Sequence, residues 1–167
     1  MQAYTPTTIE KIRTLNDGFR YEVEMVYLTV RLRKALYSKG GIDQAQLLNN
    51  MFIESVTLHT RVLLEFFRNN RKHPNDVKAG DFMKANETWT EPNIDTDSRY
   101  RNLKQVKDRV NEELAHLSYG RVIQKKTQWD LDAILKELSQ ILNEFLSKCN
   151  NQYIEADLRG LFKDFVK

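Results

Sequence analysis

The chain has 167 residues, which suits one domain with its own hydrophobic core, and its 26 basic and 23 acidic side chains leave a formal net charge of +3. This small excess permits a nucleic-acid partner without requiring one. Cys149 is the only cysteine, which excludes an internal disulfide framework and a thiolate metal cluster. The first residues are polar and no apolar run is long enough to span a bilayer, so we expect a cytoplasmic protein with no membrane partner.

Apolar residues recur at helical spacing through the first part of the chain. They predict a first helix over about 8–38, with a break near Asn16-Asp17-Gly18 and a stop at Gly40-Gly41. A second helix is predicted from about 43 to 69, and Asp43 suits its N-cap. Its apolar face is broad, which makes it the main core helix. This face consists of Leu48, Phe52, Val56, Val62, Leu63, Phe66 and Phe67.

The helical pattern breaks down over about 71–97. Prolines, a glycine and several asparagine and aspartate residues interrupt it, so we predict a long connection with one short turn around 76–82. Phe82 and Trp89 are expected to pack this connection onto the rest of the domain.

Helical spacing returns in the last part of the chain. It predicts a third helix from an N-cap at Ser98 to about 120–123, and a fourth from about 127 or 128 to 147. A short terminal helix over about 154–165 follows. The third helix has a narrow apolar stripe, made of Leu103, Val106, Val110, Leu114 and Leu117. The predicted fold is all-α: a single domain over 1–167, built as a four-helix bundle with a short additional C-terminal helix.

The segment from Arg109 to Arg121 in the third predicted helix carries the most suggestive chemistry. Arg109 and His116 stand seven residues apart, nearly two helical turns, so their side chains project from the same face. Histidine transfers protons near neutral pH and arginine stabilises anionic phosphate, so the pair suits attack on a phosphodiester. Both lie on a flank of the apolar stripe, where the alternative interpretation is an exposed ion-pair network that includes Glu113.

An arginine six intervening residues before a histidine, on a late helix of an all-α bundle, resembles the motif of the HEPN superfamily. The segments 59–67, 76–82 and 115–119 are similar to a pattern in uncharacterised bacterial HEPN-like proteins, and the resemblance covers about residues 8–150. It implies a metal-independent endoribonuclease, often of a toxin or phage-defence system, in which arginine and histidine meet across a homodimer. Other members of the superfamily have lost catalysis and act as binding modules.

The resemblance also implies roles for individual side chains. His116 would act as general acid or base on the ribose 2′-hydroxyl or the leaving oxygen, and Arg109 would stabilise the charged transition state. Asn111 and Tyr119 would position the phosphate. By their spacing, Glu112 or Glu113, one turn before His116, would orient the imidazole or raise its pKa. Asn111 also occupies the place where the shortest form of the motif has its arginine. Either Arg109 fills that role at a longer spacing or the site has degraded.

The second interpretation is a non-catalytic helical module that binds a partner protein or nucleic acid. Aromatic and basic residues are interleaved in two clusters, a pattern able to contact RNA bases and backbone. These clusters are Phe66-Phe67-Arg68 with Arg71-Lys72, and Tyr100-Arg101 with Lys104. The alternative for each cluster is a core edge beside a solvated charged face. Arg61 and Arg121 are the candidate substrate-binding residues.

Self-association is expected from the third helix, because its narrow apolar stripe indicates an element less completely buried than the second helix. We therefore predict a homodimer.

No cofactor and no metal are predicted. Glu113 and His116 have the spacing of one half of a di-metal site in a helical bundle, but the second half is missing. His59 is expected to be a hydrogen-bonded core residue. Arg61 is interpreted as an ion-pair partner of Glu65 four residues later, with the alternative that it lies beside the bundle groove near the third helix.

Overall fold

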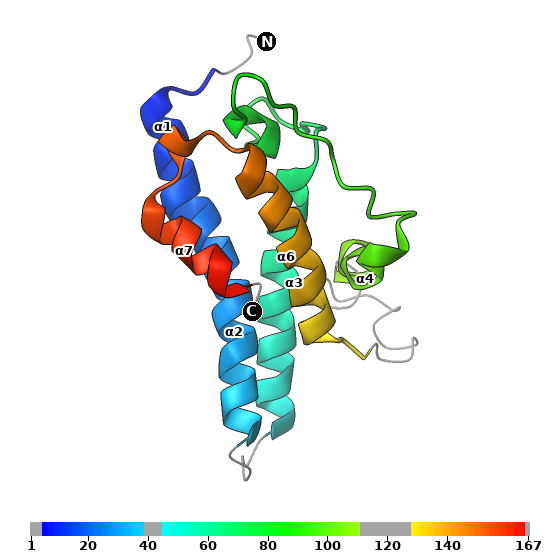
Figure 1. The fold of residues 1–167 in the computed structure, drawn as a ribbon. Coiled ribbons are helices and arrows are strands. Elements are labelled where there is room, and N and C mark those ends of the chain that lie inside the picture. Colours follow the sequence, from blue (N-terminus) through cyan, green and yellow to red (C-terminus); the bar gives the residue numbers. More distant parts are fainter. Residues whose placement is uncertain (1–4, 39–44, 111–127, 166–167) are drawn as a thin grey trace.

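The computed structural model describes residues 5–38, 45–110 and 128–165, and the regular elements within these ranges are helices (Figure 1). One isolated antiparallel bridge, between Met83 and Cys149, is the β-type pairing found there. The predicted all-α fold is therefore confirmed. The helices are α1 (Thr8–Arg13), α2 (Arg20–Ser38), α3 (Ala45–Phe67), α4 (Arg101–Val110), α6 (Leu131–Lys148) and α7 (Ala156–Phe165).

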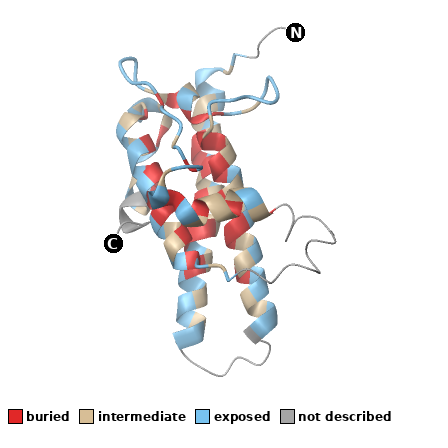
Figure 2. Ribbon diagram, turned by 90° about the vertical axis from the view of Figure 1, so that its right-hand side faces the viewer, coloured by how far each residue is buried: buried red, intermediate tan, exposed pale blue. Residues whose placement is uncertain are grey.

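The bundle is built around the antiparallel pair α2 and α3, against which α6 packs (Figure 1). α4 contacts both α3 and α6, and the short α7 packs on α6. Buried residues collect where other elements cover the α2–α3 pair. The free ends of the pair, which are the end of α2 near Ser38 and the start of α3 near Ala45, carry exposed and intermediate residues (Figure 2). An aromatic cluster forms the centre of the core and consists of Phe19, Phe66, Phe67, Trp89 and Phe145.

The predicted break in the first helix is a π-helical turn, Thr14–Phe19, between α1 and α2. Asn16 lies buried within it, and its amide donates to the carbonyl oxygens of Ile12 at 2.9 Å and Tyr153 at 3.1 Å. Its side-chain oxygen accepts from the backbone N–H of Glu155 at 3.1 Å. The chain thus stays helical through the irregularity, and the widened turn fastens the segment that leads into α7.

The connection between α3 and α4 packs by its own aromatic residues, as predicted. A 3-10 turn, Ala79–Phe82, places Phe82 in the core, and the indole of Trp89 donates to the carbonyl oxygen of Phe67 at 2.7 Å. The backbone N–H of Asn150 donates to the carbonyl oxygen of Phe82 at 2.8 Å, so the connection is also tied to the end of α6.

α4 begins at Arg101, after a 3-10 turn whose N-cap is Asp97, so Ser98 is not the cap that the sequence predicts. The Asp97 side chain accepts from the backbone N–H of Arg99 at 2.9 Å. α6 begins at Leu131, three to four residues later than predicted, because Asp130 accepts from the N–H of Ala133 and forms the N-cap.

The part of the third predicted helix that the structure describes buries its apolar stripe completely. Leu103, Val106 and Val110 are each 0% exposed, and the predicted continuation to about residue 123 lies outside the described residues. These three residues are therefore not available for self-association. The expectation that the stripe is incompletely buried, on which the predicted homodimer was based, is wrong for this part of the helix.

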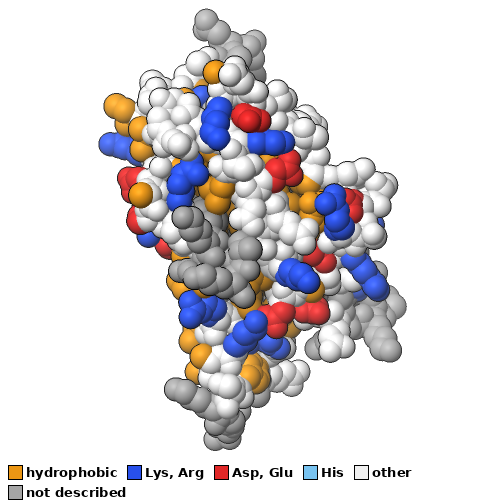
Figure 3. All heavy atoms as spheres, viewed as in Figure 1, with side chains coloured by type: hydrophobic (Ala, Val, Ile, Leu, Met, Phe, Trp, Pro, Cys, Tyr) orange, Lys and Arg blue, Asp and Glu red, His pale blue; other side chains and the backbone are white. Residues whose placement is uncertain are grey.

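The surface mixes charges of both signs. On the face shown in Figure 3, basic and acidic side chains are interspersed, and hydrophobic side chains reach the surface towards the free end of the α2–α3 pair. Within the described ranges, the membrane-length apolar helix that a bilayer span requires is not found.

Candidate functional site

The predicted catalytic segment begins at the end of α4. Arg109 lies in the last turn of this helix, is half-buried and takes part in an interaction. The other predicted site residues lie outside the described residues, so their meeting with Arg109 stays a prediction. They are Asn111, Glu113, His116, Tyr119 and Arg121.

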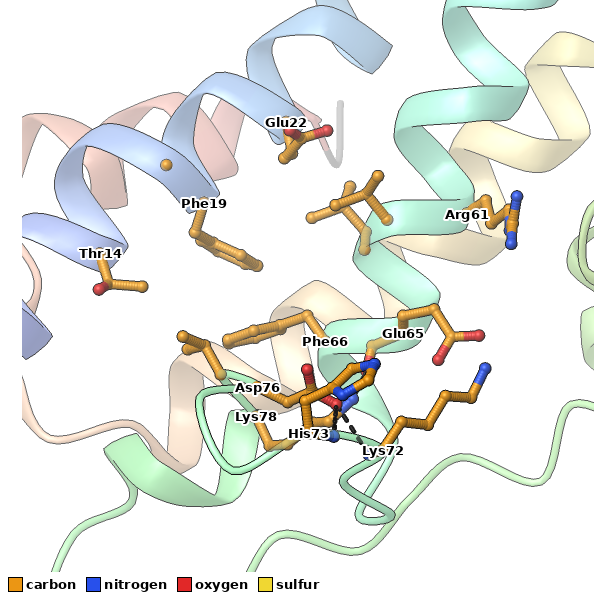
Figure 4. A pocket seen from close by; sticks show the side chains of 14 residues that line it. Thr14, Phe19, Glu22, Arg61, Glu65, Phe66, Lys72, His73, Asp76 and Lys78 are labelled. Atoms are coloured by element: carbon orange, nitrogen blue, oxygen red, sulfur yellow. Dashed lines mark hydrogen bonds between the residues drawn. The ribbon is translucent and has the colours of Figure 1, made fainter. Parts of the chain in front are cut away.

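A cleft of about 480 Å³ lies between the start of α2, the last turns of α3 and the loop that follows α3 (Figure 4). This volume falls within the range of about 300–1,000 Å³ that is typical of small-ligand sites. Its apolar lining comes from Phe19, Val62, Leu63, Phe66 and Val77. Phe19 and Phe66 are almost fully buried, whereas Val62 is 50% exposed. Val62 was predicted to lie in the core and does not.

Each acidic side chain that lines the cleft already has a partner. The carboxylate of Glu22 accepts a hydrogen bond from Nδ1 of His59 at 2.7 Å, and Glu65 pairs with Arg68 at 2.9 Å. The side chain of Asp76 accepts the backbone N–H groups of His73 at 3.1 Å and of Lys72 at 2.8 Å. These two hydrogen bonds lower the pKa of the Asp76 carboxyl.

Three side chains able to carry positive charge line the same cleft without a hydrogen bond or ion pair in the described part of the chain: Arg61, Lys72 and His73. Arg61 is half-buried, and Lys72 and His73 are exposed. In Figure 4, Arg61, Lys72 and His73 lie towards one side of the cleft and Thr14 lies on the opposite side. Phe19 lies between Thr14 and these three residues.

The loop after α3 is held by its own hydrogen bonds. Arg71 donates to the carbonyl oxygen of Asp76 and to the side chain of Asp81, and Lys78 is buried, with its ammonium group donating to the carbonyl oxygen of Glu65 at 2.7 Å. Together with the bonds accepted by Asp76, these contacts fix the backbone from which Lys72 projects. The cationic side of the cleft is therefore set on an ordered loop.

Two residues that the sequence singles out line this cleft. Arg61 is one of the two predicted substrate-binding residues, and Lys72 belongs to a predicted aromatic and basic cluster. His73 carried no signal in the sequence. An aspartate that follows a proline-containing stretch, here Asp76 after Pro74, is a turn signal that could have indicated an ordered loop.

Two predicted contacts of α3 have different outcomes. His59 is hydrogen-bonded and largely buried, as predicted, and packs edge-on against the ring of Tyr21. The expected ion pair between Arg61 and Glu65 is wrong, because Glu65 pairs with Arg68 instead.

Neither a metal ligand set nor a reactive thiol marks the described part of the chain. Histidine, cysteine, aspartate and glutamate residues there form no group of three placed to hold a metal ion. Cys149 is buried, which raises the pKa of its thiol to about 12 and keeps it protonated near neutral pH.

Compared with protein-family models, curated proteins and solved structures, the chain gives no match. The resemblance to the HEPN superfamily therefore rests on the motifs in the sequence, and the structure defines the class of the protein as an all-α helical bundle with a cleft lined by both basic and acidic side chains.

Proposed function

We propose that the protein is a nucleic-acid-binding helical module, and that the cleft beside α3 binds single-stranded RNA. The observation that supports this proposal is the asymmetry of partners within the cleft. Its three acids are engaged by a histidine, an arginine or backbone N–H groups, whereas Arg61 and Lys72 have no partner in the described residues. Hydrogen bonds and ion pairs hold the three carboxylates in place, and the side chains of Arg61 and Lys72 remain available to an anionic ligand.

The chemistry of the lining suits a nucleotide unit. The guanidinium of Arg61 can donate two parallel hydrogen bonds to phosphate oxygens, and the ammonium of Lys72 can act as a point charge on a neighbouring phosphate. The exposed side chain of Val77, which lines the same cleft, provides an apolar surface for a base. A base can enter such a cleft only when it is unstacked, which favours a single strand over a duplex.

A polymer suits this arrangement better than a small acid does. Arg61 comes from α3 and Lys72 from the following loop, with Glu65 between them in Figure 4. Cations at separate points along one side of a cleft match successive phosphates of a chain, whereas a small acid concentrates its charge at one point.

The test is fluorescence anisotropy with a labelled single-stranded RNA of about 12 nucleotides, at several salt concentrations. Arg61→Ala is expected to weaken binding about tenfold, which corresponds to about 1.4 kcal/mol. Lys72→Ala should reduce the slope of log affinity against log salt by about 0.7, the value of one single-strand phosphate contact. Lys136→Ala, the same change of charge on an exposed position of α6, is the control and should leave affinity unchanged. Equal affinity of wild type and Arg61→Ala would contradict the proposal.

Two further ligands identify what the cleft recognises. A duplex of the same sequence should bind more weakly than the single strand, because its bases are stacked and paired. A 5′-monophosphate nucleotide should compete with the RNA at high concentration if the cleft takes one nucleotide unit. RNA binding that Arg61→Ala does not affect, but Arg101→Ala does, would place the RNA on the second aromatic and basic cluster instead.

A second candidate function is metal-independent RNA cleavage by Arg109 and His116. The observation that favours it is that α4, which carries Arg109, packs against α3, which carries Arg61. The cleavage motif would then lie on a neighbour of the RNA-binding helix. Purified protein should cleave a cellular RNA pool in EDTA, and His116→Ala should lose that cleavage while its circular dichroism spectrum is unchanged. Absence of cleavage by the wild type would contradict this second function and leave RNA binding without cleavage as the proposed function.

A further inference from the structure

The outward face of the α2–α3 pair carries large apolar side chains that nothing in the described structure covers. Their exposed fractions range from 39% to 56%. On α2 they are Tyr21, Leu28 and Leu32, and on α3 they are Leu47, Met51, Leu58 and Val62. We refer to these seven residues as the outer face.

Contacts between the two helices place both groups of residues on the same side. Glu22 meets His59, Thr29 meets Ser55 and Arg33 meets Asn49, so the helices run antiparallel with these residues at their interface.

Helical geometry orients each helix about that interface. Counted from Thr29 at 100° per residue, the buried Val26 and Val30 of α2 lie at about +60° and +100°, and the exposed Leu28 and Leu32 at about −100° and −60°.

The same count on α3, taken from Ser55, gives a matching result. The buried Phe52 and Val56 lie at about +60° and +100°, and the exposed Leu58 and Met51 at about −60° and −40°. Because the helices are antiparallel, equal signs mean the same side of the pair. One side of the pair therefore faces the core, and the opposite side is the outer face.

The size of the outer face is that of a protein interface. At roughly half exposure of residues whose full area is on the order of 200 Å², seven residues present roughly 700 Å². The largest apolar patch on a typical monomer is about 300–600 Å², and a stable interface buries about 800 Å² on each partner.

The spacing of the outer face is that of a helical packing seam. Leu28 and Leu32 on α2 are four residues apart, as are Leu47 and Met51 on α3, and Leu58 follows Met51 after a full heptad of seven residues. Such intervals keep apolar side chains in register with a facing helix.

We propose that the outer face binds a second copy of this chain, so that two α2–α3 pairs pack across a two-fold axis into a four-helix layer. A two-fold interface uses the same patch on both subunits, and an antiparallel helix pair with an apolar stripe on each helix is suited to meet its own copy. The partner copy would reach the border of the RNA-binding cleft, because Val62 belongs to both the cleft and the outer face.

Sedimentation velocity across a range of protein concentrations tests this proposal. The wild type is expected to form a dimer of twice the 19.7 kDa chain mass. The double variant Leu28→Glu, Met51→Glu should have a dimer dissociation constant at least 100-fold higher than that of the wild type, because it places four carboxylates in the apolar interface. Ile9→Glu is the matched control, since Ile9 is 64% exposed on α1 and lies outside the outer face, and it should remain dimeric.

Circular dichroism of the double variant separates loss of the dimer from loss of the fold. A second readout does not depend on it: Leu58→Cys, placed near the centre of the outer face, should form an intermolecular disulfide on mild oxidation, while the buried Cys149 should not. A wild type that stays monomeric at high concentration, or a double variant that stays dimeric, would overturn the proposal. In that case the outer face would be assigned to a different protein partner.

Discussion

Glu137 of α6 holds the start of α4, and its replacement gives a sharp test of how the bundle is assembled. Glu137 is 8% exposed, and its carboxylate accepts the backbone N–H groups of Asn102 and Leu103, each at 2.9 Å, and the side-chain amide of Asn102 at 2.6 Å. The two N–H groups belong to the first turn of α4, where a helix has no partner of its own for them.

The expected loss of stability follows from these three bonds. A hydrogen bond to a charged group contributes about 1.5–3 kcal/mol, and loss of a helix cap costs about 0.5–2 kcal/mol. The two contributions partly count the same bonds, so they cannot simply be added. We expect Glu137→Ala to lower the free energy of unfolding by about 3 kcal/mol. Glu137→Gln keeps one acceptor oxygen but loses the charge, so its loss should be about half as large.

Urea unfolding followed by circular dichroism measures both values. Glu144→Ala is the control, since Glu144 lies on the same helix, is exposed and pairs only with Lys148, and its effect should stay within about 0.5 kcal/mol. A Glu137→Ala protein as stable as the control variant would refute the reasoning that a buried carboxylate from α6 caps α4.

Three further outcomes are expected. Trp89→Phe removes the buried indole donor to the carbonyl oxygen of Phe67, so the free energy of unfolding by urea should fall by about 1–3 kcal/mol. Cys149, with a thiol pKa raised to about 12 by burial, should resist a thiol reagent at pH 8 until urea unfolds the chain. The Arg20 side chain lowers the pKa of Asp157 from 3.8. The resulting stabilisation is present above that value and is lost as the pH falls through the lower folded pKa, so Asp157→Asn should destabilise at pH 7 and progressively less as the pH falls below 3.8.

Helix positions could be predicted because apolar periodicity is a local property of the sequence. The long helices, the irregular turn at Asn16 and the aromatic packing of the 71–97 connection all follow from residue type and spacing. Helix starts were less accurate, because several residues near each start can cap. Asp97 and Asp130 take this role, and nothing local to the sequence distinguishes Asp97 from its neighbour Ser98.

Exposure of apolar residues could not be predicted from periodicity alone. Val62 belongs to the same helical pattern as Leu63 and Phe66, yet it is half exposed while both neighbours are buried. The ends of α2 and α3 near Ser38 and Ala45 extend beyond the other described helices (Figure 1), and in the described part of the chain no element covers the apolar residues on the outward side of the pair. Which side of a helix other elements cover is a tertiary property, and the sequence pattern does not contain it.

The choice of partner by Glu65 decides whether Arg61 is available to a ligand, and it leads to a final prediction. Glu65 lies four residues after Arg61 and three before Arg68, and both spacings allow an ion pair on a helix. In the structure it pairs with Arg68, which leaves Arg61 available to a ligand. Arg68→Ala should therefore free Glu65 to pair with Arg61 and weaken RNA binding several-fold, although Arg68 does not line the cleft.

The double variant Arg68→Ala, Glu65→Gln separates this indirect effect from a direct contact of Arg68 with RNA. With the charge of Glu65 removed, Arg61 has no competing partner and the affinity measured by anisotropy should return to the wild-type value. If the double variant binds as weakly as Arg68→Ala, Arg68 contacts the RNA itself. If Arg68→Ala binds as tightly as wild type, the partner choice of Glu65 does not control the cleft, because the two ion pairs are then too weak at this exposed position to matter.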